Sequence, residues 1–327
     1  MTTGYPESTL TCPRQLPQSQ TGHDRLDGHK VKQGEFVVRK RSAGLVTVAI
    51  LLAGLLTPAS ASALLGVNDW ACRPSAAHPK PVVLVHGTGD NKDYTWRALG
   101  PQLAARGYCV YSLTYGVLPN APVVDDVVGG LTPIESSAGE LKSFIDKVRL
   151  ATAADKVDIV GYSQGTMVPT YYAKFLNGRN NIDAYVSLAP LWDGTNPLGL
   201  GSTFMLLRLL GFGGTLGAIG DCIACPEMLT GSDFLAKIRE GGIFLPEITY
   251  TNIVTQHDNV IWPYTSGLGE GPNVTNIVLQ DTCPADEVNH VGLVVDPNAL
   301  GQVFNALDPA HATPVPCVPM GPISPRQ

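Results

Sequence analysis

Residues 156–166 read KVDIVGYSQGT, and this stretch decides the fold. A β-branched run predicts a buried strand, a G-x-S-x-G pentapeptide follows it, and residues 166–176 continue with a helical pattern. Strand, sharp turn and helix in this order place Ser163 at the tip of a strained elbow. Gly161 and Gly165 flank it, because a Cβ at either position would collide with the neighbouring strand or helix. Ser163 is therefore the candidate nucleophile; an ordinary strand-to-helix turn is the competing interpretation of the motif alone.

The composition is that of a globular protein with one large α/β core. The chain has 327 residues, of which 44% are hydrophobic and 15% are charged. Its net charge of -6 and its pI near 5.6 provide no basic surface. A nucleic-acid partner is therefore not expected.

The N-terminal region has the pattern of a secretory signal. Three basic residues at 39–41 precede an apolar stretch over residues 43–56, and small residues follow at 59–63. We expect a signal peptide over residues 37–63, cleaved after Ala63, and therefore an extracellular protein. The apolar stretch is shorter than the roughly 18 residues of a spanning helix, so no stable membrane anchor is expected. Residues 1–36 form a polar extension, which suggests that the true start lies nearer Val37.

The cysteines support export to an oxidising compartment. Loss of Cys12 with the signal leaves an even number, six, and three disulfides are expected. Strand geometry and proximity favour the pairs Cys72–Cys109, Cys222–Cys225 and Cys283–Cys317. The pair at 222 and 225 could instead be a redox pair or half of a zinc site, but the sequence has no second such pair.

Strands and helices alternate along the expected mature chain. Strands are predicted over residues 81–86, 108–115, 156–160, 182–188, 248–255 and 274–280, all buried; helices are predicted over 96–104, 132–148, 166–176 and 297–307. Thr132 to Glu135 has the pattern of a capping box with Pro133 at the first helical position. The alternation predicts a parallel sheet with right-handed crossovers.

Residues 191–244 interrupt this alternation. They include an apolar run at 204–210 and a glycine-rich stretch at 211–220, which suggests a cap insertion over the carboxyl edge of the sheet. A helix that is apolar on all faces is most often simply buried, and the alternative is a lid that meets acyl chains. The proline-rich residues 309–327 are expected to form an extended tail that Cys317 fixes in place.

A serine nucleophile needs a base that removes its proton. His290 follows the last predicted strand and is assigned as this base, ahead of His257. His86 lies in the turn after the first strand, where it is expected to shape the backbone rather than transfer protons.

The base in turn needs an acid that orients it. Asp258 follows the strand over residues 248–255, and loops at the carboxyl ends of strands are where a parallel sheet builds its site. Asp193 also follows a predicted strand and is the main alternative; Asp281 and Asp286 are weaker candidates. A helix cap or a turn is the ordinary role of such an aspartate.

Ester and amide hydrolysis also need N–H donors for an oxyanion. The amide of Gln164, directly after the nucleophile, is one candidate. The Gly-Thr-Gly loop after the first strand offers a second donor at Thr88, whose hydroxyl could add a third.

Taken together, these motifs resemble secreted lipases of the α/β-hydrolase superfamily, especially an actinobacterial group of triacylglycerol lipases and esterases. The matching residues are Val85-His86-Gly87-Thr88-Gly89, Thr95-Trp96, Gly107-Tyr108-Cys109-Val110-Tyr111, Gly161-Tyr162-Ser163-Gln164-Gly165, Asp258, Pro263-Tyr264, Cys283-Pro284 and His290. Some fungal lipases are similar in their oxyanion loop and elbow. Tyr162 and Thr166 depart from the pattern, since histidine and glycine are frequent at these positions, and Trp192-Asp193 is a further departure.

The resemblance implies an α/β-hydrolase fold with helices on both faces of a mostly parallel sheet. It also implies carboxylic ester hydrolysis through an acyl-enzyme, with no metal and no organic cofactor. The expected partner is a lipid ester at a lipid–water interface. An acyltransferase acting on cell-envelope lipids and a non-catalytic lipid-binding protein on the same scaffold are the alternatives, and the sequence makes no prediction of oligomeric state.

Overall fold

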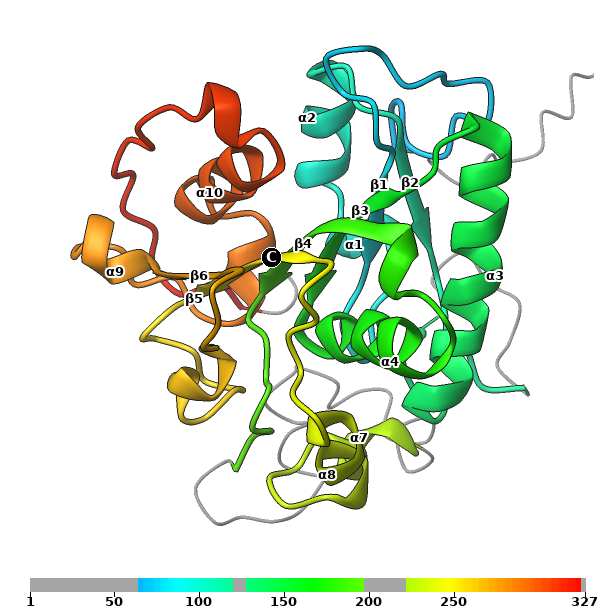
Figure 1. Cartoon of the computed structure of the whole chain (residues 1–327). Coiled ribbons are helices and arrows are strands. Elements are labelled where there is room, and N and C mark those ends of the chain that lie inside the picture. The colour runs from blue at the N-terminus through cyan, green and yellow to red at the C-terminus, as the bar shows by residue number, and fades with distance from the viewer. Residues whose placement is uncertain (1–63, 120–127, 197–221, 325–327) are drawn as a thin grey trace, which may run out of the picture. The chain divides into compact units, whose positions relative to one another are not determined.

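Six parallel strands form one sheet in residues 64–119, 128–196 and 222–324, which are the residues that the computed structural model describes (Figure 1). The strands are β1 (Val82–Val85), β2 (Val110–Leu113), β3 (Val157–Tyr162), β4 (Ile182–Leu188), β5 (Thr249–Val254) and β6 (Val274–Val278). Their order in the sheet is β2-β1-β3-β4-β5-β6, and all five pairings are parallel. The expected parallel sheet is therefore confirmed. The expected extension over residues 1–36 and signal peptide over 37–63 lie outside the described residues.

Helices cover both faces of the sheet. The longer ones are α2 (Leu99–Ala105), α3 (Ile134–Thr152), α4 (Met167–Phe175) and α10 (Pro297–Leu307). Helices α3 and α4 pack together on one face, and α2 and α10 lie on the other (Figure 1). There the guanidinium of Arg106, directly after α2, lies 3.6 Å from the ring centroid of Phe304 in α10. Short helices α1 (Lys92–Thr95), α7 (Ala224–Glu227), α8 (Asp233–Arg239) and α9 (Leu279–Thr282) complete the described set.

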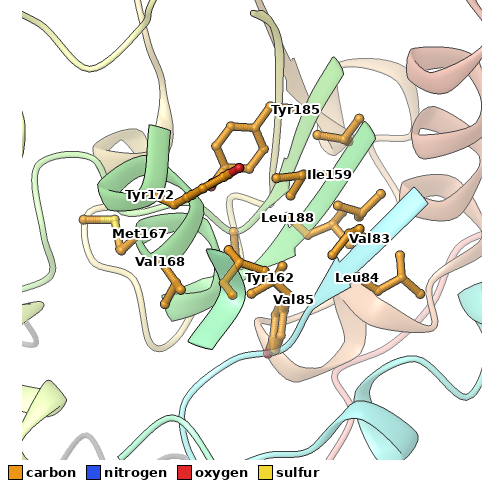
Figure 2. Packing of buried hydrophobic residues seen from close by; sticks show 14 of the residues in the cluster. Val83, Leu84, Val85, Ile159, Tyr162, Met167, Val168, Tyr172, Tyr185 and Leu188 are labelled. Atoms are coloured by element: carbon orange, nitrogen blue, oxygen red, sulfur yellow. The ribbon is translucent and has the colours of Figure 1, made fainter. Parts of the chain in front are cut away.

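The core lies between the sheet and its helices. Strands β1 and β3 are buried over their whole length, as expected for central strands with helices on both faces. Figure 2 shows side chains from these strands, β4 and α4 meeting in one apolar cluster. Because Val85 of β1 pairs with Gly161 of β3, the loop that follows β1 and the elbow that follows β3 begin at the same level of the sheet.

Two local predictions near the sheet were wrong. The last strand ends at Val278, and Leu279 begins α9, so the predicted strand over residues 274–280 is too long. This strand is also not fully buried, because β6 is the edge of the sheet and Thr275 and Asn276 are exposed.

The predicted capping box was also wrong. Pro133 precedes α3 as its N-cap residue, and no side chain from Thr132 or Glu135 caps the helix. The carboxylate of Glu227 accepts a hydrogen bond from the Ile134 amide at 2.8 Å instead. Glu227 of α7 thus takes the place of a local cap. Its carboxylate also interacts favourably with the positive N-terminal end of the α3 dipole.

The expected insertion over residues 191–244 is described only in its flanks, since its central residues 197–221 lie outside the described part. Thr195 and Leu229 form an isolated parallel bridge that joins the two flanks. Helix α8 packs against α4 and α7. Whether the apolar run at 204–210 is a buried helix or a lid stays a prediction.

The structure contains the three expected disulfides, Cys72–Cys109, Cys222–Cys225 and Cys283–Cys317. The pair at 222 and 225 is therefore a disulfide here and not half of a zinc site. Within the described ranges, the longest helices are too short or too polar to cross a membrane.

Candidate active site

The elbow after β3 holds Ser163 in a strained backbone conformation. Its φ angle is +53°, a left-handed value that non-glycine residues rarely adopt. A Cβ on Gly165 would lie 2.1 Å from the carbonyl oxygen of Val85, and one on Gly161 would lie 2.4 Å from that of Gly165. Both flanking glycines are thus required by backbone atoms of β1 and of the elbow itself, as the sequence predicted.

Three of the candidate side chains meet at the carboxyl edge of the sheet. The hydroxyl oxygen of Ser163 lies 3.0 Å from Nε2 of His290. On the other side of the same ring, Nδ1 lies 2.8 Å from Oδ2 of Asp258. Ser163 is 7% exposed, His290 is fully buried and Asp258 is 8% exposed. Side chains from three distant parts of the sequence therefore form one hydrogen-bonded series that is almost completely buried.

Asp258 is held in place by its own backbone loop. Its Oδ1 accepts hydrogen bonds from the amides of Val260 and Ile261, at 2.8 and 2.7 Å, while Oδ2 faces His290. The two carboxylate oxygens thus have different partners, which fixes the plane of the group.

The alternative candidates do not join this series. The side chain of Asp193 is 56% exposed and forms an ion pair with Arg239. His257 and Asp281 are exposed. Asp286 is buried, but its carboxylate bonds with other partners, described below.

The loop after β1 lies against the elbow, where an oxyanion would form. The Thr88 hydroxyl donates to Oε1 of Gln164 at 3.0 Å, and a Cβ on Gly87 would lie 3.2 Å from that of Ser163. Gly130 approaches from a third segment, since its Cβ would lie 2.6 Å from Oε1 of Gln164. This contact was not predicted, although the glycine pair Gly129-Gly130 is a sequence signal of close backbone approach.

Comparison with known proteins shows the family of this chain. Residues 79–300 match the family model described as lipase (class 2). The chain belongs to the class 2 lipases. Its parallel sheet with helices on both faces is the α/β-hydrolase fold that the motifs in the sequence implied.

Three of the solved structures that match this chain are a lipase B, a mature lipase and a lipase-esterase related protein. Lipase B of Aspergillus fumigatus is 19% identical with a TM-score of 0.55, and the match covers 72% of this lipase and 54% of that chain. The mature lipase BlEst2 of Bacillus licheniformis is 15% identical with a TM-score of 0.49, over 71% and 92% of the two chains. A lipase-esterase related protein from Clostridium acetobutylicum is 19% identical with a TM-score of 0.47, over 72% and 97%. The chain thus spans about half the length of the Aspergillus protein, and the likeness to that protein shows a shared fold.

His86 of this lipase is a structural histidine, as expected. Its Nδ1 donates to the Gly87 carbonyl at 2.7 Å, its Nε2 accepts from the Tyr115 amide at 3.3 Å, and its ring stacks on that of Tyr115. Burial lowers the pKa of His86 to about 4, so the ring is neutral at pH 7. It shapes the loop that carries Thr88 and lies outside the series at Ser163.

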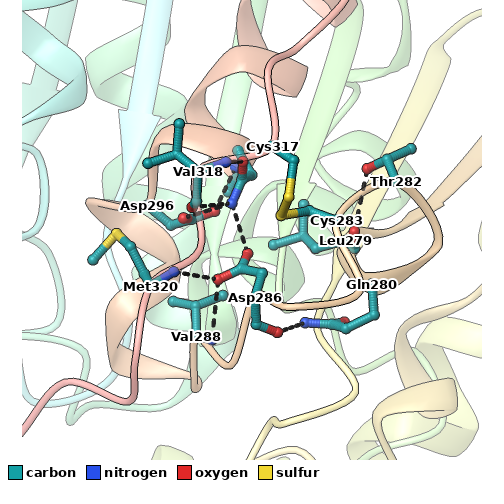
Figure 3. The surroundings of a disulfide bond; sticks show 12 residues. Leu279, Gln280, Thr282, Cys283, Asp286, Val288, Asp296, Cys317, Val318 and Met320 are labelled. Atoms are coloured by element: carbon teal, nitrogen blue, oxygen red, sulfur yellow. Dashed lines mark hydrogen bonds between the residues drawn. A yellow bond between two sulfur atoms is a disulfide. The ribbon is translucent and has the colours of Figure 1, made fainter.

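The segment that carries His290 is fixed to the C-terminal tail of the lipase. Besides the Cys283–Cys317 disulfide, the buried carboxylate of Asp286 accepts from the Met320 amide at 3.1 Å and from Nδ2 of Asn298 at 2.8 Å (Figure 3). Asn289 bonds with the backbone of Ile323 in both directions, at 3.0 and 3.1 Å. The tail is thus joined to the loop on both sides of Asp286, up to the residue before His290.

Across residues 64–119, 128–196 and 222–324, no cluster of three or more His, Cys, Asp or Glu side chains is arranged to hold a metal ion. The described site itself holds a hydroxyl, an imidazole and a carboxylate in series.

Proposed function

We propose that this class 2 lipase is a secreted serine hydrolase that cleaves carboxylic esters of lipids of the triacylglycerol type. The observation that carries the proposal is the continuous series from Ser163 through His290 to Asp258, with distances of 3.0 and 2.8 Å. A serine hydroxyl becomes a nucleophile when an adjacent imidazole accepts its proton and a carboxylate orients that imidazole.

The proposed reaction has two halves. In the reactive tautomer, Nδ1–H of His290 donates a hydrogen bond to Oδ2 of Asp258 and stays on the ring. Nε2 is then free to accept the proton of Ser163 as the serine oxygen attacks the ester carbonyl. The imidazolium then donates this proton to the leaving alcohol, and an acyl-enzyme forms. Water attacks the acyl-enzyme with Nε2 again as the base, and the fatty acid leaves as Ser163 regains its proton.

The oxyanion of each tetrahedral intermediate would bind to the amides of Thr88 and Gln164. The contact between the Thr88 hydroxyl and Oε1 of Gln164 supports this role, because it brings the two donor segments together beside the elbow. Donors fixed in advance need no reorganisation when negative charge develops.

Ser163→Ala tests the proposal. We expect the variant to fold like the wild type and to lose p-nitrophenyl butyrate hydrolysis by roughly a thousandfold or more. A fluorophosphonate should label the wild type at Ser163 and leave the variant unlabelled. Retained hydrolysis by the variant would remove the proposal. Comparing soluble p-nitrophenyl butyrate with emulsified triolein then tests the lipid substrate class.

The three disulfides support the proposed secretion, because such bonds persist in oxidising compartments. Mass spectrometry of the protein recovered from the culture medium should give an N-terminus at Leu64. Retention of all the protein inside the producing cells would contradict secretion.

A further inference from the structure

We infer that Tyr162 is a positioning residue for the reaction, because its hydroxyl holds the main chain of His290. The hydroxyl donates to the His290 carbonyl at 3.1 Å, and the two rings lie 5.1 Å apart between centroids. Tyr162 is the residue directly before Ser163, so one peptide links the nucleophile to the group that fixes the base. This inference rests on the proposed roles of Ser163 and His290.

His290 needs such a contact because it lies outside the sheet. It precedes a single 3₁₀ turn, Val291–Val294, in a segment without strand pairing. The other bond to its carbonyl, from the Leu293 amide, is long at 3.4 Å. Asp258 and Ser163 act on the imidazole alone. The Tyr162 hydroxyl therefore joins the main chain of His290 itself to the end of β3, a buried strand of the sheet.

The surroundings of Tyr162 hold its ring in place. It ends β3, it is 6% exposed, and a Cβ on Gly87 would lie 3.1 Å from two of its ring carbons. The ring thus contacts the loop that carries Thr88 as well as the base. Burial also raises the pKa of Tyr162 well above its usual value, so the hydroxyl keeps its proton and can donate at neutral pH.

Removal of the hydroxyl should change turnover more than binding. A displacement of about 1 Å between reacting groups can lower a rate roughly a hundredfold. Tyr162→Phe keeps the ring and removes one oxygen. We expect kcat for p-nitrophenyl butyrate to fall about ten- to a hundredfold, with KM changed less than about threefold, because the contact orients the base and not the substrate.

Tyr172→Phe is the matched control. Tyr172 is also a buried tyrosine whose hydroxyl forms a hydrogen bond, with Asn181, but it lies on α4 and contacts none of the three side chains in the series. Both variants should lower the melting temperature by a similar amount. Only Tyr162→Phe should lower kcat, when kcat is calculated from the concentration of active sites that react with the fluorophosphonate. The downfield proton resonance of Nδ1–H in His290 should shift in Tyr162→Phe alone.

The outcomes separate this inference from the proposed function. If the wild type hydrolyses the ester, Ser163→Ala does not, and Tyr162→Phe stays within twofold of the wild type, the positioning role is wrong and the proposed function stands. Equal losses of kcat in the Tyr162 and Tyr172 variants would also overturn it. Activity in Ser163→Ala would instead remove the proposed function, and this inference with it.

A second pair of variants applies if Tyr162→Phe does not fold. The residues 4-aminophenylalanine and 4-methylphenylalanine match tyrosine in size, and only the first carries an N–H donor at the position of the hydroxyl. The amino variant should retain turnover and the methyl variant should lose it. Equal turnover in the two variants would overturn the role of the hydroxyl.

Discussion

Replacement of Asp258 by asparagine should remove nearly all activity and leave the fold intact. In the wild type, Oδ1 of Asp258 accepts from the amides of Val260 and Ile261, and Oδ2 faces Nδ1 of His290. The single oxygen of asparagine has to stay with the two amides, because the alternative leaves two buried N–H donors facing an NH₂ group, at about 1–3 kcal/mol each. The NH₂ group of the variant therefore faces Nδ1.

This arrangement selects the wrong tautomer of the base. Nδ1 of His290 has to accept from the asparagine, so its proton moves to Nε2, which then cannot accept the proton of Ser163. In a serine protease with the same series of side chains, the equivalent change lowers kcat about 10⁴-fold. We expect a loss of that order here, which corresponds to about 5 kcal/mol of transition-state stabilisation.

The assay is kcat for p-nitrophenyl butyrate at pH 7.5, with fluorophosphonate labelling of Ser163 as a second measure. Asp193→Asn is the control, because it loses only an exposed ion pair with Arg239, worth under about 1 kcal/mol, and should keep kcat within twofold. The melting temperature of Asp258→Asn should remain close to that of the wild type. An Asp258→Asn enzyme within tenfold of the wild type, or a large loss in Asp193→Asn, would refute this reasoning.

Three further predictions concern stability. Burial raises the pKa of Asp158 to about 6, so the stability that its protonated form contributes is complete below pH 4 and is lost as the pH rises through 6. In urea unfolding, the free energy of unfolding of Asp158→Asn should therefore equal that of the wild type near pH 4 and exceed it by up to about 3 kcal/mol at pH 8. A difference that does not change with pH would contradict this. Gly165→Ala should lower the free energy of unfolding by at least about 3 kcal/mol, because the new Cβ would collide with the backbone of β1. In Gly139→Ala the new Cβ meets nothing within 4 Å, and the free energy of unfolding should rise by about 0.5–1 kcal/mol. Both changes are measured by thermal unfolding. Replacing Cys72 and Cys109 by serine opens a disulfide of sequence separation 37 and should cost about 4 kcal/mol in the same measurement.

The sequence predicted the parts of this protein that depend on local pattern. The six strands and the four longer helices were found because of their apolar patterns, and the elbow was found because only glycine fits on both sides of Ser163. The short helices were not predicted. The sequence also favoured Asp258 as the partner of His290, since both come after strands of one parallel sheet whose carboxyl ends share an edge. The same argument left Asp193 open as an alternative, and only the structure separates the two aspartates.

Contacts between distant segments could not be predicted in this way. The cap on α3 comes from Glu227, 93 residues after Ile134, and the contact from Tyr162 reaches His290 across 128 residues. Neither pair leaves a periodic signal, because a single side chain on one segment meets a single backbone group on another. The sequence marked Tyr162 only as a departure from a family pattern, and its partner became visible only in the fold.

The two members of the central pair are held by different means. Ser163 follows a fully buried strand, and its position comes from the ladder of β3 and from two glycines that β1 and the elbow require. His290 has no ladder, and buried backbone groups outside a ladder still need partners. The Tyr162 hydroxyl donates to the His290 carbonyl, and the Thr255 hydroxyl donates to the Val288 carbonyl at 2.7 Å. The side chains of Asp286 and Asn289 join the same segment to the tail through the backbone of Met320 and Ile323. Single side-chain contacts to the end of the sheet and to the tail therefore give the base the support that the strand ladder gives to the nucleophile, which is why irregular backbone can hold an imidazole within hydrogen-bonding distance of both its partners.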